Sequence, residues 1–319
     1  MNGLPKVLVT GATGFVGSAL VRCLTERAQS EVICASRSAD GNGGACRHHD
    51  LLDSQQLPQL DDVHVIVHTA ARVHVMVEHL QDSLGAFRAA NVTGTLALAM
   101  AAAASGVRRF VYISSVKVNG EETHADHPFS ALAKPAPQDE YGLSKLEAEQ
   151  GLRKIELETG MEVVIIRPPL VYGPGVKANF HSMMKWLYRG IPLPLGAIDN
   201  KRSLVALDNL VDLLITCTTH PAAAGQTFMI SDGEDLSTTE LLTRTAFALG
   251  KKPRLISVPP VILQVLGRAA GKRKVAQRLC GSLQVDISAT CRRLDWTPPV
   301  SVDQGLKLSV RAYLAEADN

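Results

Sequence analysis

Short apolar segments alternate with amphipathic segments over the first half of the chain, and this alternation constrains the fold more than any other feature. The apolar segments are predicted strands and the amphipathic ones predicted helices. Near-continuous apolar strands separated by helices are typical of a parallel sheet covered on both faces. We therefore predict the α/β class with a doubly wound parallel sheet. The predicted strands are Lys6–Thr10, Glu31–Ser36, Val63–Thr69, Phe110–Ser114 and Met161–Arg167, and the predicted helices are Val16–Arg27, Asn91–Gly106 and Tyr141–Thr159.

The alternation ends after Pro168-Pro169, where prolines and glycines become frequent. The 319 residues suffice for about two domains. We predict a first domain over residues 1–172 and a smaller C-terminal α/β domain over 173–319, of which about 203–230 returns to the first sheet. Ser237 and Glu240 predict a capping box in a helix over Asp235–Gly250. Val258–Gly271, followed by Lys272-Arg273-Lys274, predicts a packed and partly exposed helix, with a membrane-surface helix as the alternative.

Composition excludes several classes of protein. The net charge is +2 and only 4% of the residues are aromatic, so nucleic-acid binding is not expected. The six cysteines are scattered without a Cys-x-x-Cys pair, which favours a reducing compartment and a cytoplasmic location. Thr95–Ala104 is about half the length of a membrane span, and no signal-peptide pattern is present. No integral membrane segment is expected.

Three glycines follow the first predicted strand in the segment Thr10-Gly11-Ala12-Thr13-Gly14-Phe15-Val16-Gly17. Gly11 permits a tight turn, Gly14 allows a close approach to a pyrophosphate, and Gly17 lets helix and strand pack closely. The helix that follows offers unpaired N–H groups and a favourable dipole. The segment therefore predicts a dinucleotide-binding site, to which Thr13, Phe15 and Val16 contribute.

The end of the second strand indicates which dinucleotide binds. NAD sites usually carry an acidic residue there, whereas an arginine accommodates the 2′-phosphate of NADP. Here the strand ends in Ser36-Arg37-Ser38, with no acidic residue before Asp40. We therefore favour NADP(H), with NAD(H) as the alternative. Asp50-Leu51 follows a third short segment and is predicted to meet the adenine.

Tyr141 and Lys145 are four residues apart and so share one face of a predicted helix. A tyrosine has an ordinary pKa near 10, and a neighbouring ammonium lowers it toward the range of proton exchange. Ser114 and Ser115 end the preceding strand, where a hydroxyl can hold a substrate carbonyl or alcohol. These residues predict a catalytic site for proton transfer.

With these motifs, the chain resembles the extended short-chain dehydrogenase/reductases, a group with a Rossmann fold that includes nucleotide-sugar epimerases, dehydratases and reductases. The resemblance implies that Ser115, Tyr141 and Lys145 are catalytic. It also implies that Ala70, Ala71, Arg72, Asn91, Ser114 and Pro168 lie at the cofactor, beside Tyr141 and Lys145. The further motifs that carry it are His68-Thr69-Ala70-Ala71, Asn91-Val92-Thr93-Gly94-Thr95 and Arg167-Pro168-Pro169-Leu170-Val171-Tyr172-Gly173-Pro174-Gly175.

Two positions distinguish the activities within this group. Val116 and Lys117 stand where the 4,6-dehydratases carry an Asp-Glu pair, so dehydration is not expected. Arg37 argues against the 4-epimerases, which usually have an acid at the second strand. The segments around Lys117 and Asn179 look closest to bacterial reductases of UDP-2-acetamido-2,6-dideoxy-hexos-4-ulose. The resemblance implies that the UDP-sugar meets His74, Ser115, Lys117, Asn179 and Arg202, with Arg268, Arg273 or Arg278 as a second diphosphate ligand.

Three functions follow, in order of preference. The first is NADPH-dependent reduction of a C4 ketone to UDP-N-acetylquinovosamine or UDP-N-acetylfucosamine for surface polysaccharide such as O-antigen. The second is a UDP-N-acetylhexosamine 4-epimerase with tightly bound NAD, and the third is a non-catalytic dinucleotide-sensing protein. The family also implies a homodimer. No metal is expected, because the residue types that bind zinc, among them His64 and His68, are not spaced to converge.

Overall fold

Seven parallel strands form the central sheet, in the order β3-β2-β1-β4-β5-β6-β9. The computed structural model describes residues 4–37, 45–73, 82–124 and 127–317. Strands at the centre of the sheet are buried on both faces, as their apolar sequences require, and the predicted α/β class with a doubly wound parallel sheet is confirmed. The strands are β1 (Lys6–Thr10), β2 (Glu31–Ser36), β3 (Ala45–His48), β4 (Val65–His68), β5 (Arg109–Ile113), β6 (Glu162–Arg167) and β9 (Thr227–Met229).

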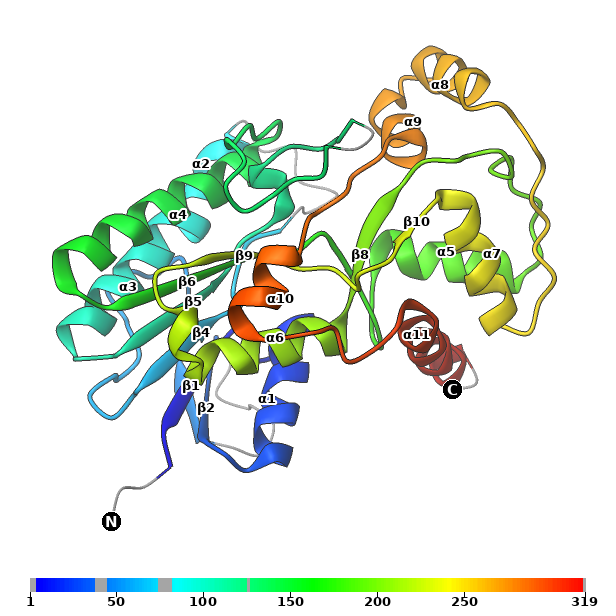
Figure 1. Cartoon of the computed structure of the whole chain (residues 1–319). Helices are drawn as coiled ribbons and strands as arrows, with labels where there is room; N and C mark the ends of the chain where they lie inside the picture. The colour runs from blue at the N-terminus through cyan, green and yellow to red at the C-terminus, as the bar shows by residue number, and fades with distance from the viewer. Residues whose placement is uncertain (1–3, 38–44, 74–81, 125–126, 318–319) are drawn as a thin grey trace.

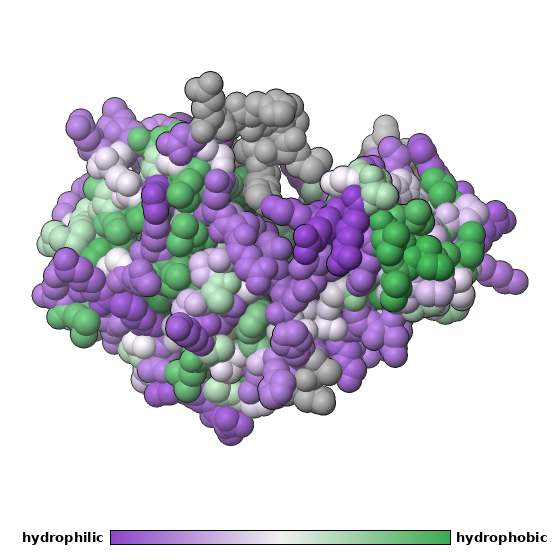
Figure 2. All heavy atoms as spheres, turned by 90° about the horizontal axis from the view of Figure 1, so that it is seen from above, coloured by the Kyte–Doolittle hydropathy of each residue, from purple (hydrophilic) through white to green (hydrophobic). Residues whose placement is uncertain are grey.

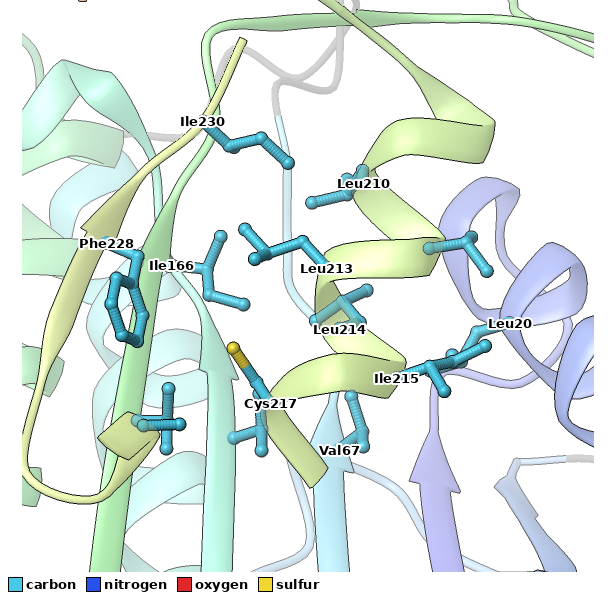
Figure 3. Packing of buried hydrophobic residues seen from close by; sticks show 14 of the residues in the cluster. Leu20, Val67, Ile166, Leu210, Leu213, Leu214, Ile215, Cys217, Phe228 and Ile230 are labelled. Atoms are coloured by element: carbon cyan, nitrogen blue, oxygen red, sulfur yellow. The ribbon is translucent and has the colours of Figure 1, made fainter. Parts of the chain in front are cut away.

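Helices cover both faces of this sheet (Figure 1). On one face, Leu210, Leu213 and Leu214 of α6 pack toward Val67 and Ile166 of the sheet (Figure 3). On the other face, α3 and α4 bury alanines and leucines against the same strands. The bounds are α1 (Phe15–Arg27), α2 (Ser83–Arg88), α3 (Thr95–Ala104), α4 (Glu140–Thr159) and α6 (Leu207–Thr219), with a π-helix η1 (Ala89–Gly94) and short 3₁₀ helices η2 (Val116–Val118) and η3 (Pro221–Ala223).

A second, smaller lobe is built on the three-stranded sheet β10-β8-β7 (Figure 1). Its own apolar core lies between this sheet and helices α5, α7 and α11. Within the second half of the chain, α6 and β9 return to the large sheet, whereas β8 pairs in the small one. The bounds are β7 (Leu170–Tyr172), β8 (Arg202–Ala206), β10 (Asp235–Leu236), α5 (Ala178–Tyr188), α7 (Thr238–Ala248), α8 (Pro260–Ala269), α9 (Arg273–Cys280), α10 (Ser288–Leu294) and α11 (Val302–Ala317).

Two predicted helices begin elsewhere than expected. Asp235 and Leu236 form β10, because they pair antiparallel with β8, so α7 starts only at Thr238. The predicted capping box is confirmed, with both the Ser237 and the Glu240 hydrogen bonds present. The helix predicted from Asn91 becomes α-helical only at Thr95, where α3 begins, because Asn91 lies in the π-helix η1. Among the described residues, no helix is long and apolar enough to cross a membrane.

Candidate dinucleotide-binding and active site

The glycine turn brings the end of β1, the start of α1 and the segment after β4 into contact. Gly11 has a φ of +66°, and a Cβ there would lie 2.8 Å from the Ala70 nitrogen. A Cβ on Gly17 would lie 2.7 Å from the carbonyl carbon of Gly11. No larger residue fits either position without displacing main chain. The turn therefore has the close packing that the glycine spacing predicts.

A cleft of about 650 Å³ opens at this turn, at the carboxyl ends of the parallel strands. It lies where β1 has β2 on one side and β4 on the other, the switch point at which ligands bind in open α/β sheets. Predicted cofactor residues form much of its wall: Gly11, Thr13, Gly14, Ser36, Arg37, Asp50, Leu51, Ala70, Ala71 and Arg72. Phe15, Val16 and Gly17 form the first turn of α1 beside it. Ser38 lies outside the described residues.

The start of α1 fits a pyrophosphate. Gly14 is its N-cap residue, and no described side chain caps the helix. The first turn carries no acidic residue. The first N–H groups of a helix lack intrahelical partners, and the helix dipole favours negative charge there. The residues present therefore fit a dinucleotide in this cleft.

Sequence reasoning missed several residues of the cleft wall, namely His49, Leu52, Thr69, Val73 and Ala90. All five directly adjoin predicted cofactor residues in the sequence, and that adjacency is the signal that could have identified them. His49 is 4% exposed, and neither ring nitrogen has a hydrogen-bond partner among the described residues. Burial lowers the pKa of His49, which favours the neutral imidazole. A neutral ring can both donate and accept a hydrogen bond in the cleft.

The first turn of α4 holds the predicted catalytic pair. Asp139 is the N-cap residue and accepts a hydrogen bond of 2.7 Å from the Gly142 nitrogen. Tyr141 and Lys145 follow on one face of the helix, with the Lys145 ammonium 5.9 Å from the centre of the Tyr141 ring. Lys145 Nζ donates a hydrogen bond of 2.8 Å to the Ile113 carbonyl oxygen. This bond fixes the ammonium at the carboxyl end of β5.

The pKa values of the pair differ from the sequence-based expectation. Burial lowers the pKa of Lys145 to about 7, an effect that the nearby Glu149 carboxylate opposes. Burial also raises the pKa of Tyr141, and the Asp139 carboxylate adds to that rise. The protein side chains alone therefore hold the pKa of Tyr141 above its ordinary value, contrary to the expected lowering. Desolvation of the phenolate is the largest cause of this rise.

Ser115 lies where three elements meet. It is the N-cap residue of η2, and its Oγ accepts a hydrogen bond of 3.2 Å from the Lys117 nitrogen. The Val116 nitrogen donates to the Pro168 carbonyl oxygen at 3.0 Å, which ties η2 to the end of β6. A Cβ on Gly142 would lie 2.7 Å from the Lys117 carbonyl oxygen, so η2 also packs on the first turn of α4. The ends of β5 and β6 therefore converge with the Tyr141 helix.

Ser114 Oγ, immediately before Ser115, is buried and has no hydrogen-bond partner among the described residues. The Ser114 nitrogen donates to the Ile166 carbonyl oxygen at 2.7 Å, which continues the pairing of β5 with β6. The hydroxyl is thus available to a ligand, as the sequence predicts for a cofactor contact. A buried hydroxyl without a partner is costly unless a ligand or water completes it.

Asn91 is fully buried in the π-helix η1 and connects the cleft to α4. Its Oδ1 accepts from the Arg72 nitrogen at 2.8 Å, and its Nδ2 donates to the Arg72 carbonyl oxygen at 3.0 Å. The same Nδ2 donates to Ser144 Oγ at 3.1 Å, and Ser144 Oγ donates to the Tyr141 carbonyl oxygen at 2.8 Å. π-Helical turns occur frequently at functional sites. Asn91 thus links one cleft wall to the residue that carries the phenol.

The predicted substrate residues are more widely separated in the structure than the predicted cofactor residues. Lys117 forms ion pairs with Asp139 and with Glu121, the second at 3.3 Å. Asn179 is exposed in the first turn of α5. Arg202 donates to the carbonyl oxygens of Arg278 and Gly281 at 3.1 and 3.0 Å. Arg268 and Arg273 line a separate cavity of about 190 Å³, and His74 lies outside the described residues.

The histidines considered for a metal have other partners. His68 is buried, and its ring nitrogens lie 2.8 Å from Thr10 Oγ1 and 3.0 Å from Thr95 Oγ1. His64 accepts a hydrogen bond from the Lys6 nitrogen at 3.1 Å. Within the described ranges, no three His, Cys, Asp or Glu side chains are grouped to hold a metal ion. His68 is therefore a buried core residue with both ring nitrogens hydrogen-bonded.

Comparison with known proteins places these features in context. The pattern of the NAD dependent epimerase/dehydratase family matches residues 7–231. A UDP-glucose 4-epimerase from Vibrio cholerae is 47% identical over 322 residues, covering 99% of this chain and 98% of that protein. The structure of UDP-glucose 4-epimerase from Thermotoga maritima with UDP-glucose has a TM-score of 0.78 at 21% identity, covering 98% of this chain and 99% of that one. UDP-glucuronic acid 4-epimerase from Bacillus cereus in complex with NAD has a TM-score of 0.77 at 21% identity, with the same coverage.

These similarities correct the functional prediction. The prediction of an NADPH-dependent 4-ketoreductase is wrong, because the relative that is 47% identical is an epimerase. The preference for NADP(H) has no support, because similar structures contain NAD. Both predictions gave weight to Arg37, which lies exposed at the cleft. An exposed arginine beside the cleft is also compatible with NAD, whose adenosine ribose carries no 2′-phosphate.

Proposed function

The chain belongs to the NAD-dependent epimerase/dehydratase family, and from that membership we propose that it is a UDP-sugar 4-epimerase with tightly bound NAD. It is an enzyme of this family that uses a nicotinamide dinucleotide. The observation that carries the proposal is the 47% identity to the Vibrio cholerae UDP-glucose 4-epimerase along 99% of the chain. The site geometry supports it, because Ser115 and Lys145 lie with Tyr141 where the ends of β5 and β6 meet the first turn of α4.

Each protein group has a separate task in this proposal. Bound NAD, which the glycine turn and the first turn of α1 would hold, would supply reversible acceptance of a hydride at C4 of the sugar. Tyr141 removes the proton from the C4 hydroxyl and later returns it. Ser115 donates a hydrogen bond to the C4 oxygen, and Lys145, held by the Ile113 carbonyl oxygen, places its charge beside the phenol. Epimerisation leaves no net oxidation, so no external reductant is consumed.

The remaining residues orient the ligands. The first turn of α1 and Gly11, Gly14 and Gly17 hold the pyrophosphate of the dinucleotide, with Arg37 and Ser36 at the adenosine ribose. Asn179 and Arg202 hold the UDP moiety, so that the sugar lies against Tyr141. Anchoring the nucleotide part of a substrate positions its reacting carbon, which lowers the entropic barrier.

The substrate class is UDP-hexoses and their N-acetyl forms. Similar structures include a UDP-glucose 4-epimerase and a UDP-N-acetylglucosamine 4-epimerase from Bacillus cereus. We further propose a cytoplasmic homodimer that supplies sugars for surface polysaccharide. The six cysteines, all within the described residues, form no disulfide bond, which agrees with a reducing compartment.

The test is to incubate purified protein, without added cofactor or reductant, with UDP-glucose, UDP-galactose, UDP-N-acetylglucosamine or UDP-N-acetylgalactosamine in turn. We expect at least one gluco/galacto pair to interconvert to the same equilibrium from both sides, as read by NMR of the C4 configuration. Denatured protein should release NAD as its main dinucleotide. Absence of interconversion with NAD bound, or NADP as the released dinucleotide, would contradict the proposal.

A further inference from the structure

Helix α8 in the small lobe carries an apolar face that nothing in the described structure covers. No residue of α8 is buried. Val261, Ile262, Val265 and Leu266 are between 48% and 68% exposed, and their spacing places them on one side of the helix. None of them belongs to an apolar core of the protein. Four large apolar side chains together on one exposed helix face indicate a binding surface.

Two further exposed apolar side chains lie close to α8 in the sequence. Ile256 precedes α8 and is 54% exposed, and Val275 on α9 is 42% exposed. Helices α8 and α9 pack on each other, because Gly267 leaves room for Ala276. Seen from above, a green apolar region lies beside a purple region on the side of the molecule that carries α8 and α9 (Figure 2). The apolar surface therefore borders a hydrophilic one.

The chain before, within and after α8 is strongly basic in sequence. Residues 251–281 contain eight Lys or Arg and no Asp or Glu, although the chain as a whole has a net charge of only +2. The rest of the chain consequently carries a net charge of −6. Glu122 faces α8 and α9, where it lines the small cavity with Arg268 and Arg273. The basic residues are Lys251, Lys252, Arg254, Arg268, Lys272, Arg273, Lys274 and Arg278.

We propose that α8 and the basic residues around it dock the protein on the surface of an anionic lipid bilayer. An exposed apolar helix face bordered by Lys and Arg lies in the plane of a membrane interface, with its apolar side chains at the acyl boundary. The basic side chains then meet anionic headgroups. Ten residues are too few to span a bilayer, so the helix lies on the membrane.

The charge argues against a second copy of the chain as the occupant. A symmetric contact through α8 presents the same surface twice, and residues 260–280, which form α8 and α9, contain five Lys or Arg and no Asp or Glu. Like charges brought together at an interface oppose association. A negatively charged bilayer matches both the apolar and the basic part of the surface. The proposal is independent of the epimerase activity.

The experiment is sedimentation of the full-length protein with vesicles of phosphatidylcholine alone or mixed with phosphatidylglycerol. We expect binding to the mixed vesicles only, and weaker binding as salt is added. Val265→Asp combined with Leu266→Asp should weaken binding by about tenfold or more, because two apolar side chains leave the acyl boundary. Lys272→Glu combined with Lys274→Glu should weaken it by a similar factor, since each basic residue near an anionic surface contributes about 1 kcal/mol.

Matched control variants make the same kinds of substitution at exposed positions away from α8. Leu132→Asp changes a side chain that is 97% exposed outside the patch, and Lys307→Glu with Arg311→Glu makes the same charge change on α11. Both should bind vesicles as the wild type does, and circular dichroism should show that every variant folds. Equal binding to neutral and anionic vesicles, or undiminished binding of the patch variants, would overturn the proposal. Self-association that the patch variants abolish, without vesicle binding, would instead assign the face to a dimer.

Discussion

The ammonium of Lys145 lies 5.9 Å from the centre of the Tyr141 ring, one helical turn away on α4. The ammonium donates a hydrogen bond to the carbonyl oxygen of Ile113. The two side chains thus share an environment that is buried enough to oppose charge on both of them. Substitutions in and around this pair test the proposed chemistry.

Tyr141→Phe removes only the phenolic hydroxyl. The ring contact with Phe87, with centroids 6.0 Å apart, remains possible, so the fold should be preserved. Loss of a general acid–base group should lower kcat by roughly 10²–10⁴-fold while UDP binding persists. Measurement of kcat for UDP-sugar interconversion, with UDP affinity from calorimetry, checks this. Turnover at the wild-type rate would remove Tyr141 from the mechanism.

Lys145 should make the stability of the nucleotide-free protein depend on pH. Burial lowers its pKa from 10.5 to about 7, so between these values the folded chain binds fewer protons than the unfolded chain. Stability increases with pH wherever the unfolded state binds more protons. The contribution of this site to the free energy of unfolding should therefore rise from about pH 7 toward pH 10.

The comparison with Lys145→Met isolates this contribution from other titrating groups. Urea unfolding at a series of pH values should show the wild type gaining stability relative to Lys145→Met as pH rises. Parallel curves for the two proteins would show that Lys145 keeps an ordinary pKa in the folded chain.

Asn91 should act through its position, because its amide joins the Arg72 main chain to Ser144. Asn91→Asp keeps the acceptor for the Arg72 nitrogen but loses both hydrogen bonds donated by Nδ2. We expect a loss of about 1–3 kcal/mol in unfolding free energy, since buried acceptors are left unpaired. The value of kcat should fall further than KM rises, because the first turn of α4 loses its anchor. Thr25→Ala, a change at an exposed position near the end of α1, is the control and should leave both constants near their wild-type values.

Gly17→Ala should separate dinucleotide binding from the general fold. The added methyl would lie 2.7 Å from the Gly11 carbonyl carbon, so α1 must move away from the glycine turn. Overpacking of this kind costs roughly 1–3 kcal/mol of stability. The displaced helix start should retain less dinucleotide through purification, as measured by absorbance after denaturation. Dinucleotide content equal to that of the wild type would show that the turn tolerates the methyl group.

Local patterns were sufficient for much of the fold. Lys6–Thr10 and Glu31–Ser36 form strands with the predicted bounds, because both are apolar runs that end at turn residues. The capping box at Ser237 and Glu240 depends only on side chains three residues apart. The glycine spacing likewise predicted the close approach of main-chain segments at the turn between β1 and α1. Such features can be predicted because the residues that determine them are neighbours in the chain.

Contacts between distant segments decided the remainder. Asp235 and Leu236 continue a helical pattern but form a strand, since β8 offers a pairing edge about 30 residues earlier. The π-helix η1 contains Asn91, whose side chain is hydrogen-bonded to Arg72 and Ser144. These two residues are too far from Asn91 in the sequence for a local pattern to predict the contacts. The small sheet of β7, β8 and β10 similarly joins strands that are separate in sequence.

The sequence by itself determined the parallel sheet, the glycine turn and the placement of Tyr141 and Lys145 on one helix face, because period and spacing are local properties. Only the tertiary structure decided the charge preferences of that pair and the exposure of the α8 face. Desolvation depends on the atoms that surround a group. Lys145 of α4 lies against Tyr112 and Ile113 of strand β5, which are distant in the sequence. Burial is a property of the assembled fold, and it governs the chemistry of this site.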